Sequence, residues 1–332
     1  MADIEHFRFR DLHSNVFIGT ASDRYAGWIG QIYSGRLYDG RISRRTKQVG
    51  GRSFVEEVLP VESVEEYFRH FGVLELDFTF YGPLLDKEGK PTQNLHVLRT
   101  YSQYLKKSDR LILKAPQTVF SKKLRRGGAY IENEEYLNPD IFTGRFYKPA
   151  LVLVGPWLSG LIFEQEYQRK QDRSSTKAFG KELDAFFNAI PKDSRYHVEI
   201  RTDALLTDPV FDVLERHGVG QVLSHWTWLP PLSRQFALGG RRFLNRGRQC
   251  IVRLMTPRGM RYQDAYALAH PFSHMKNGMM NPEMVDETAH LMRAAIEDDA
   301  RINVIINNRA GGNAPLIAKQ IVRQFLAGEA VS

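Results

Sequence analysis

The chain has 332 residues, of which 42% are hydrophobic and 25% are charged, and its net charge is +8. These values are those of a soluble globular protein with a large core. Its single cysteine, Cys250, excludes an intrachain disulfide and a cysteine-rich zinc site. The longest apolar stretch, residues 150–163, is too short to span a membrane. Because the charged N-terminus also lacks an apolar signal core, the composition predicts a cytoplasmic protein.

Eight short runs that are apolar, or that alternate between apolar and polar residues, are predicted to be strands. They are residues 15–20, 73–80, 110–115, 160–166, 196–201, 221–225, 250–255 and 302–306. Stretches with helical periodicity separate them, for example residues 62–72 and 175–189. This alternation predicts one TIM-type (β/α)8 barrel domain over residues 1–332, with its core at about 16–327. The alternative is an open doubly wound sheet, but the turn after the first strand, GTASDRYAG, lacks the G-x-G-x-x-G pattern.

Two segments are predicted to decorate the barrel. Residues near 34–60 are predicted to be a surface excursion, and residues near 234–249 an arginine-rich insertion. Residues 234–263 contain eight arginines and no acid. These arginines are Arg234, Arg241, Arg242, Arg246, Arg248, Arg253, Arg258 and Arg261. Two interpretations are open: solvated loops, or one positively charged face that binds an anion or a nucleic acid.

Polar residues gather at the predicted C-terminal ends of the strands, where barrels of this fold have their active sites. In residues 73–80 polar and apolar side chains alternate, so Glu75 and Asp77 are expected to point into the barrel. Buried charges are costly unless they are paired. One interpretation is therefore a salt-bridged interior, in which Glu75 or Glu199 pairs with Arg253 or Lys114.

The other interpretation is a functional site at the barrel mouth. Glu75 and Glu199 are the preferred carboxylates for acid/base or glycosidic chemistry, and Lys114 is the third candidate catalytic residue. The predicted substrate- or anion-binding residues are Asp77, Tyr81, Gln165, Arg201, Arg253, Arg258, Asn307, Asn308, Gly312 and Asn313. Four aromatic residues are candidates for stacking against a sugar or a base, or for simply covering the barrel top: Trp28, Trp226, Trp228 and Tyr81.

The loop that follows the last predicted strand (residues 302–306) has features suited to binding an anion. Gly312 permits backbone angles that other residues avoid, and Asn313 is predicted to cap the next helix. Barrels of this fold often bind phosphate in the loops after the seventh and eighth strands, at a helix N-terminus. Arg253 and Arg258 supply positive charge and paired donors. The alternative is an ordinary capped turn, with an arginine paired to a nearby carboxylate.

No cofactor is predicted. Histidines near strand ends are few, and His225 is the best placed, so a histidine-rich metal cluster cannot be built. A divalent metal site of carboxylates alone, from Glu75, Glu164 and Glu199, is the remaining metal hypothesis. No G-x-S-x-G motif supports a Ser–His–Asp triad.

Seven stretches run in the order FIGTA, YFRHFGVLELDFTFYG, LILKAP, LIFEQ, HVEIR, IVRLM and VIINNRAGGNAP. Together they resemble the domain of unknown function 72 (YecE-like) family over most of residues 16–326. The most specific pieces are Glu75 with residues 79–81, then residues 199–201, and residues 307–308 with 312–314. Residues 22–25 read Ser-Asp-Arg-Tyr where the family has Gly-Trp-Ser-Tyr. The resemblance implies a TIM-type barrel and supplies no reaction.

Three functions are compatible with these patterns. The first is a hydrolase or lyase-like enzyme that acts on a polar or anionic small molecule, such as a phosphorylated sugar. The second is a nucleic-acid-binding protein or phosphodiesterase that uses the arginine-rich face. The third is a non-catalytic barrel that binds a ligand. The expected partner is an anionic small molecule or a nucleic acid and not a membrane, and the oligomeric state does not follow from the sequence.

Overall fold

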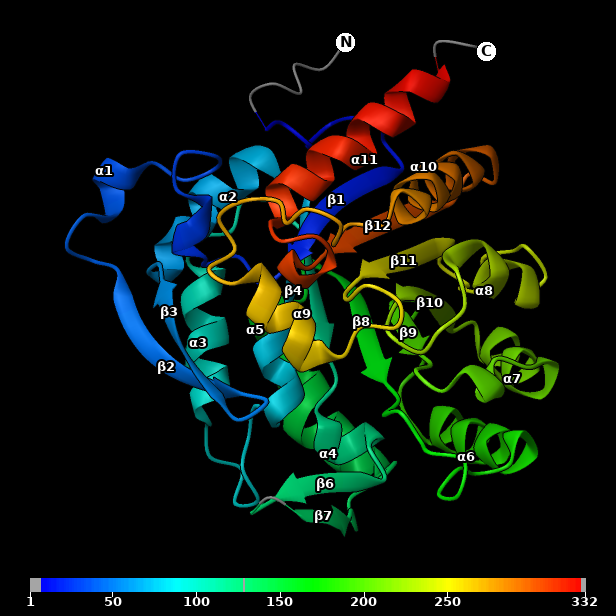
Figure 1. The fold of residues 1–332 in the computed structure, drawn as a ribbon. Coiled ribbons are helices and arrows are strands. Elements are labelled where there is room, and N and C mark those ends of the chain that lie inside the picture. The colour runs from blue at the N-terminus through cyan, green and yellow to red at the C-terminus, as the bar shows by residue number, and fades with distance from the viewer. Residues whose placement is uncertain (1–6, 128, 330–332) are drawn as a thin grey trace.

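The computed structural model describes residues 7–127 and 129–329, so the first six residues of the charged N-terminus lie outside the described part. Eight parallel strands close into a barrel in the order β1-β12-β11-β10-β9-β8-β5-β4 (Figure 1). The strands are β1 (Val16–Ala21), β4 (Val73–Leu76), β5 (Leu111–Lys114), β8 (Leu158–Glu164), β9 (Tyr196–Glu199), β10 (Gly220–His225), β11 (Gln249–Leu254) and β12 (Arg301–Ile306). The predicted (β/α)8 barrel is confirmed.

Helices in the connections between the strands surround the barrel. The helices are α1 (Gly35–Tyr38), α2 (Val64–His70), α3 (Gln93–Ser102), α4 (Gln117–Phe120), α5 (Lys148–Val154), α6 (Thr176–Ala189), α7 (Asp208–His217), α8 (Leu232–Leu238), α9 (Tyr262–Ala269), α10 (Pro282–Glu297) and α11 (Ala314–Glu329). Helix α6 shows why such segments are helical: the Ser175 hydroxyl accepts a hydrogen bond from the Ala178 amide at its start, and Phe179, Leu183 and Phe187 are buried at helical spacing.

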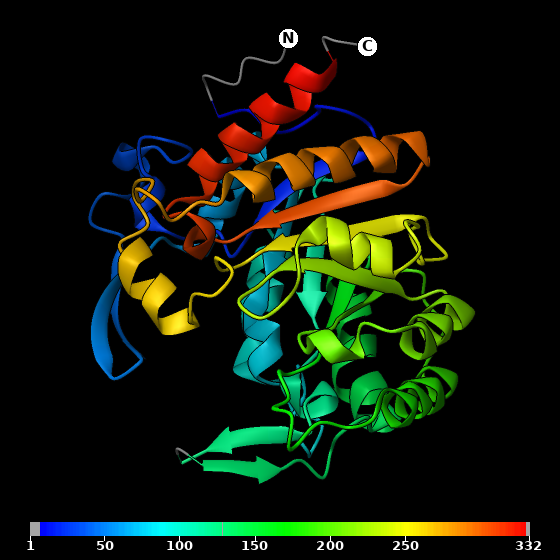
Figure 2. The same cartoon turned by 45° about the vertical axis from the view of Figure 1, so that its right-hand side comes forward.

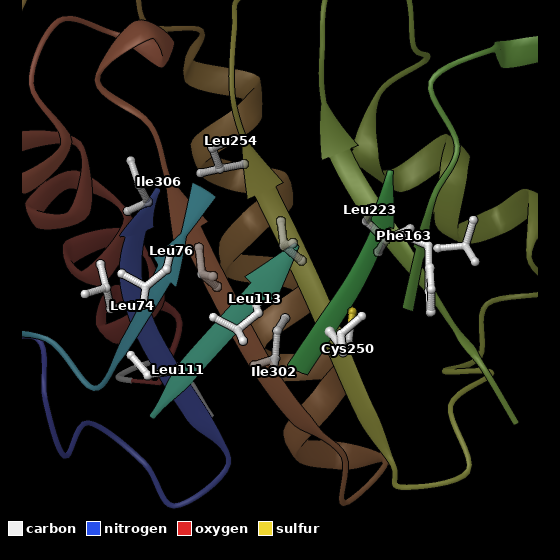
Figure 3. Packing of buried hydrophobic residues seen from close by; sticks show 14 of the residues in the cluster. Leu74, Leu76, Leu111, Leu113, Phe163, Leu223, Cys250, Leu254, Ile302 and Ile306 are labelled. Carbon is white, nitrogen blue, oxygen red and sulfur yellow. The ribbon is translucent and has the colours of Figure 1, made fainter. Parts of the chain in front are cut away.

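Alternate side chains of each strand point to opposite sides of the barrel wall, outwards to the helices or inwards to the barrel interior. Figure 3 shows one set of side chains, which includes Leu74, Leu113 and Ile302, in the cluster packed between the barrel and its helices. The alternate side chains form a separate apolar cluster: Ala21, Val73, Ile112, Ile162, Val222, Ile251, Met255 and Ile305. Such a layer of branched residues is how a barrel of this fold fills its interior. The middle of the interior is therefore packed without charge, while Arg110 and Arg301 lie over the Phe17 ring at its N-terminal end.

Residues 34–60, predicted as a surface excursion, contain α1 and an antiparallel hairpin of β2 (Ser43–Val49) and β3 (Arg52–Val58). The hairpin and α9 lie on the same side of the barrel (Figure 2), and β2 packs against α9. A second hairpin, β6 (Lys123–Arg126) with β7 (Ala129–Glu132), follows β5 and was not anticipated from the sequence. The loops after β1, β5 and β11 thus build extra walls around the barrel mouth.

The prediction of a strand over residues 73–80 is wrong in its second half. The strand β4 ends at Leu76, and residues Asp77–Tyr81 form the 3-10 helix η4. The Thr79 hydroxyl donates a hydrogen bond to the Lys114 carbonyl over 2.8 Å and accepts one from the Lys114 amide over 3.1 Å. These bonds tie the turn to β5, so Asp77 does not follow Glu75 into the interior.

Residues 234–249 are not an insertion. They begin inside α8, the helix between β10 and β11, and continue as the loop that enters β11. Arg241, Arg242, Arg246 and Arg248 precede β11 and lie at the N-terminal end of the barrel strands. Arg258 and Arg261 follow β11 and lie at the opposite end, with Arg253 between them inside the barrel. The eight arginines therefore do not form one basic face.

Within residues 7–127 and 129–329, no helix combines the length and the apolar character needed to cross a membrane. The cytoplasmic location stays a prediction.

Candidate functional site

A layer of charged side chains lies above the apolar interior, at the C-terminal ends of the strands. Five of its members belong to five different strands: Glu75 (β4), Lys114 (β5), Glu164 (β8), Glu199 (β9) and Arg253 (β11). Arg201, two residues beyond Glu199, is the sixth. All except Arg201 are buried. We call these six side chains the charged layer.

Arg253 is the centre of the charged layer. Its Nε and Nη2 atoms donate to the two carboxylate oxygens of Glu75, over 2.8 and 2.7 Å. Its Nη1 atom donates to Glu199 and, over 3.4 Å, to Glu164. One guanidinium group thus holds three carboxylates, and its contact with Glu75 is bidentate, the geometry in which arginine binds a carboxylate most strongly.

Lys114, Glu164 and Arg201 form the part of the charged layer that is nearer to solvent. The Lys114 ammonium group pairs with Glu164 and lies 3.9 Å from the centre of the Phe80 ring. Arg201 binds Glu164 over 2.6 Å and Glu199 over 3.2 Å. Its guanidinium lies 4.4 Å from the Trp226 ring, and its side chain is 15% exposed, the largest exposure in the layer. Arg201 is therefore the member most accessible to a ligand.

The strand register explains why these residues meet. Glu164 and Glu199 are direct partners in the pairing of β8 with β9, so their side chains project at the same level of the barrel. Ser224 is the partner of Arg253 in the pairing of β10 with β11, and its hydroxyl donates to Glu199 over 2.7 Å. Neither Ser224 nor Phe80 was anticipated as part of the site.

The charged layer contains three carboxylates and three cations. Burial raises the pKa of Glu164, but Arg201, Lys114 and Arg253 outweigh burial and bring it down to about 2. Burial lowers the pKa of Lys114, and Arg253 and Arg201 act in the same direction, while Glu164 opposes them. Glu164 is therefore held ionised, and Lys114 gives up its proton more readily than an exposed lysine.

We expect replacement of Glu164 by glutamine to destabilise the protein at neutral pH, and the loss to shrink in acid. The folded-state pKa of Glu164, about 2, lies below its ordinary value of 4.5. Its stabilising contribution is therefore complete above about 4.5 and is lost as the pH falls towards 2. Urea unfolding of the wild type and of Glu164→Gln, measured from pH 7 down to 3, checks this.

The control is Glu215→Gln, which removes an exposed ion pair with Arg242 and is expected to cost less than about 1 kcal/mol at any pH. A cost of Glu164→Gln that stays the same across this pH range contradicts the assignment.

Aromatic side chains surround the mouth, but not all of those predicted. Trp28 is fully buried and donates to the Asn308 side chain over 3.0 Å, so it belongs to the core and cannot stack on a ligand. Tyr81 and Trp228 are exposed, and Trp228 lies 6.0 Å from the Tyr167 ring. Trp226 is partly buried against Arg201. The available aromatic surface is that of Tyr81, Tyr167, Trp226 and Trp228.

The predicted anion site at Gly312 and Asn313 is not supported by the geometry. The Gly312 amide donates to the Asn308 carbonyl, and a side chain at Gly312 would collide with the backbone of His274 and Lys276. Asn313 caps α11, as predicted: its side-chain oxygen accepts from the Leu316 amide. This turn is closed by its own contacts, which favours the alternative of an ordinary capped turn.

Other predicted ligand-binding residues also make internal contacts. The Gln165 side-chain oxygen accepts from the amides of Arg201 and Thr202, which fixes the loop after β9. Asn307 and Asn308 accept hydrogen bonds from backbone amides of their own loop and of α11. The exposed Arg258 lies 3.9 Å from Glu283, apart from the charged layer. Asp77 accepts from the Ser22 hydroxyl over 2.8 Å, beside the barrel mouth.

The three glutamates do not surround an open position for a metal. They converge on the Arg253 guanidinium, which occupies the place that a cation between them would take. Among residues 7–127 and 129–329, no group of three acidic, histidine or cysteine side chains is arranged to hold a metal ion. Burial lowers the pKa of His225, the best-placed histidine, to about 4.

The fold and the position of the charged layer define a (β/α)8 barrel whose candidate site lies at the C-terminal mouth, where enzymes of this fold carry their active sites. The family model described as "Protein of unknown function DUF72" matches residues 17–331. The chain therefore belongs to the DUF72 family.

Two solved structures of DUF72 proteins resemble this chain. One, from Enterococcus faecalis, is 12% identical, aligns over 94% of this chain and 95% of its own, and has a TM-score of 0.55. The other, from Thermotoga maritima, is 12% identical, aligns over 94% of this chain and 99% of its own, and has a TM-score of 0.55. At 12% sequence identity, the structural similarity shows only that these proteins share a fold. A comparison with curated proteins finds no match.

Proposed function

We propose that the chain is a hydrolase or lyase-like enzyme that acts on a polar or anionic small molecule at the C-terminal mouth of the barrel. One observation carries this proposal: the charged layer, six side chains gathered at the end of the barrel where this fold performs chemistry. A sugar phosphate or a sugar acid is the type of substrate that suits it, because such a molecule offers both an anionic group and hydroxyl groups.

The energetics of burial favour a functional origin for the charged layer. A buried network of ion pairs contributes little net stability, and well-packed apolar residues of similar volume are often as stabilising or more so. The layer directly below contains Val73, Ile112, Ile162 and Ile251, so apolar packing does fill this barrel. Six charges at the mouth are therefore more than packing requires. Natural proteins keep groups that lower their stability where activity depends on those groups.

The two levels of the charged layer suit different roles. Arg201 and Lys114 lie nearest to solvent and suit an anionic substrate group, Arg201 through paired donors. Lys114, with its lowered pKa, is the candidate proton acceptor, and Glu164 stabilises the positive charge that Lys114 then carries. Glu75 and Glu199, predicted as the catalytic pair, lie deeper and hold Arg253. We assign these two glutamates a positioning role.

A nucleic-acid-binding function has less support. A protein that tracks a phosphate backbone needs its basic residues on one face. Here the arginines before β11 and those after it lie at opposite ends of the barrel, and Arg253 is enclosed by glutamates.

A thermal-shift screen of sugar phosphates, sugar acids and short oligonucleotides tests the proposed function. A ligand that binds the folded state raises the apparent stability, and we expect at least one small-molecule hit. Replacing Arg201 with methionine should remove that shift, whereas Arg242→Met, at an exposed ion pair on the opposite end of the barrel, should leave it intact. Hits confined to oligonucleotides, or a small-molecule shift equal in both variants, contradict the proposal.

A further inference from the structure

A cavity of about 660 Å³ lies beside the barrel mouth, and its lining includes none of the charged layer. Its walls come from the loop after β1, the β2–β3 hairpin, η4, α3 and residues 270–273. This volume is within the range of pockets that bind small molecules. The cavity owes its existence to the hairpin, which folds over the barrel on the side of α9 (Figure 2).

Asp23 supplies a buried carboxylate to this cavity. The residue is only 1% exposed, and its Oδ1 atom accepts a hydrogen bond from the Tyr101 hydroxyl over 2.8 Å. In the part of the chain that the structure describes, its Oδ2 atom has no hydrogen-bond partner. Tyr33 donates to the Asp23 carbonyl over 2.7 Å, so the backbone is fixed as well. A buried acceptor without a donor is costly, because the atom has lost water and gained nothing in its place.

The other charges that line the cavity explain which ligand would supply the missing donor. Arg44 and Arg45 on the hairpin are already paired with Glu57 and Glu56, over 2.9 and 2.7 Å. Asp77 adds a second carboxylate, held by the Ser22 hydroxyl. Arg24 is the remaining lining cation, and its Nε donates to the Leu59 carbonyl. Among the described residues, Asp23 and Asp77 form no ion pair, and Arg24, whose charge lowers the pKa of Asp23, is the one lining arginine left to offset them.

Apolar side chains also line the cavity. Val55 and Val58 come from the hairpin, Phe78 from η4, Val97 from α3 and Phe272 from the segment after α9. A cavity with apolar walls and a few fixed polar groups is typical of sites for small organic molecules.

We propose that this cavity binds a small organic amine, whose ammonium group donates to Asp23 Oδ2 and lies near Asp77 while its apolar part packs against Phe78 and Val97. The ammonium group would supply the missing donor to Asp23 Oδ2 and add a second positive charge beside two carboxylates that have only Arg24 near them. Burial raises the pKa of Asp23 to about 6, although Tyr101 and Arg24 act against burial. Binding of an amine adds a positive charge next to this carboxylate and should lower its pKa.

Calorimetric titration of the full chain with three size-matched probes tests this proposal. The probes are 2-phenylethylamine, 2-phenylethanol and 3-phenylpropanoate, which differ in charge but share the aromatic ring. At pH 7.5 we expect the amine to bind at least about tenfold more tightly than the other two, since only the amine can form a charged hydrogen bond with the buried carboxylate. Equal binding of the three probes, tighter binding of the carboxylate, or no saturable binding of the amine overturns the proposal.

Two variants and one control locate the binding. Asp23→Asn should weaken amine binding at least about tenfold, while Asp39→Asn, the same change at an exposed residue outside the cavity, should leave it unchanged. Val97→Trp fills the apolar part without touching Asp23 and should abolish binding, so the proposal stays testable even if Asp23→Asn fails to fold. Undiminished binding by Val97→Trp, or by a folded Asp23→Asn variant, overturns it.

Discussion

Replacing Arg253 with methionine is expected to lower the free energy of unfolding by about 3–5 kcal/mol. Arg253 is buried and is the shared partner of Glu75, Glu164 and Glu199. Without its guanidinium, Glu75 has no ion-pair partner among the described residues, because the ion pairs of Lys114 and Arg201 are with Glu164 and Glu199. An uncompensated buried carboxylate is among the few causes of so large a loss. Urea unfolding at pH 7 measures it.

The matched control is Arg242→Met, which breaks an exposed ion pair with Glu215 and is expected to cost at most about 1 kcal/mol. If Arg253→Met costs no more than this control, Arg253 is not the counter-ion that holds the charged layer together.

The joint replacement of Lys114 by methionine and Glu164 by glutamine is expected to remove ligand binding at the mouth while the fold survives. The pair carries one positive and one negative charge, so two arginines and two glutamates remain balanced. The double variant should therefore lose less stability than the sum of the single variants, with a coupling of about 0.5–3 kcal/mol. Binding of a hit from the small-molecule screen should weaken at least about thirtyfold, the loss typical for a buried charged contact.

Unfolding curves of the wild type, both single variants and the double variant give the coupling, and thermal shifts with the hit give the binding. Additive stability losses together with unchanged binding contradict this prediction and support a purely structural layer.

Much of the charged layer was predictable from the sequence, because strand alternation and strand ends place side chains reliably. Glu75 lies two residues from Val73 in an alternating run, so both face the interior. Lys114, Glu199 and Arg253 lie at or next to the last residue of their strands, which a parallel barrel brings together. The pairing of Arg253 with both Glu75 and Glu199 agrees with the salt-bridged interior that the sequence left open. How deeply each side chain lies in the barrel was not predictable, because it depends on how far neighbouring strands are shifted along one another.

The errors concern contacts between distant segments. The η4 turn depends on hydrogen bonds from Thr79 to the Lys114 backbone, 35 residues away along the chain. The backbone at His274 and Lys276 packs on Gly312 and disfavours the predicted anion site, and no local pattern indicates this contact. Asp23 lies two residues beyond the end of β1, so its position at the C-terminal end of a strand marked it as a possible site residue. Its cavity, however, requires the β2–β3 hairpin and α3 to close around it.

We propose that the charged layer at the barrel mouth binds the substrate. A crystal structure of the wild-type chain with a small-molecule hit from the thermal-shift screen tests it most directly. We expect density for the hit above the charged layer, with its anionic group within hydrogen-bonding distance of Arg201 or Lys114. A hit bound only elsewhere, with Arg201 still on Glu164 and Glu199 and Lys114 still on Glu164, contradicts the claim.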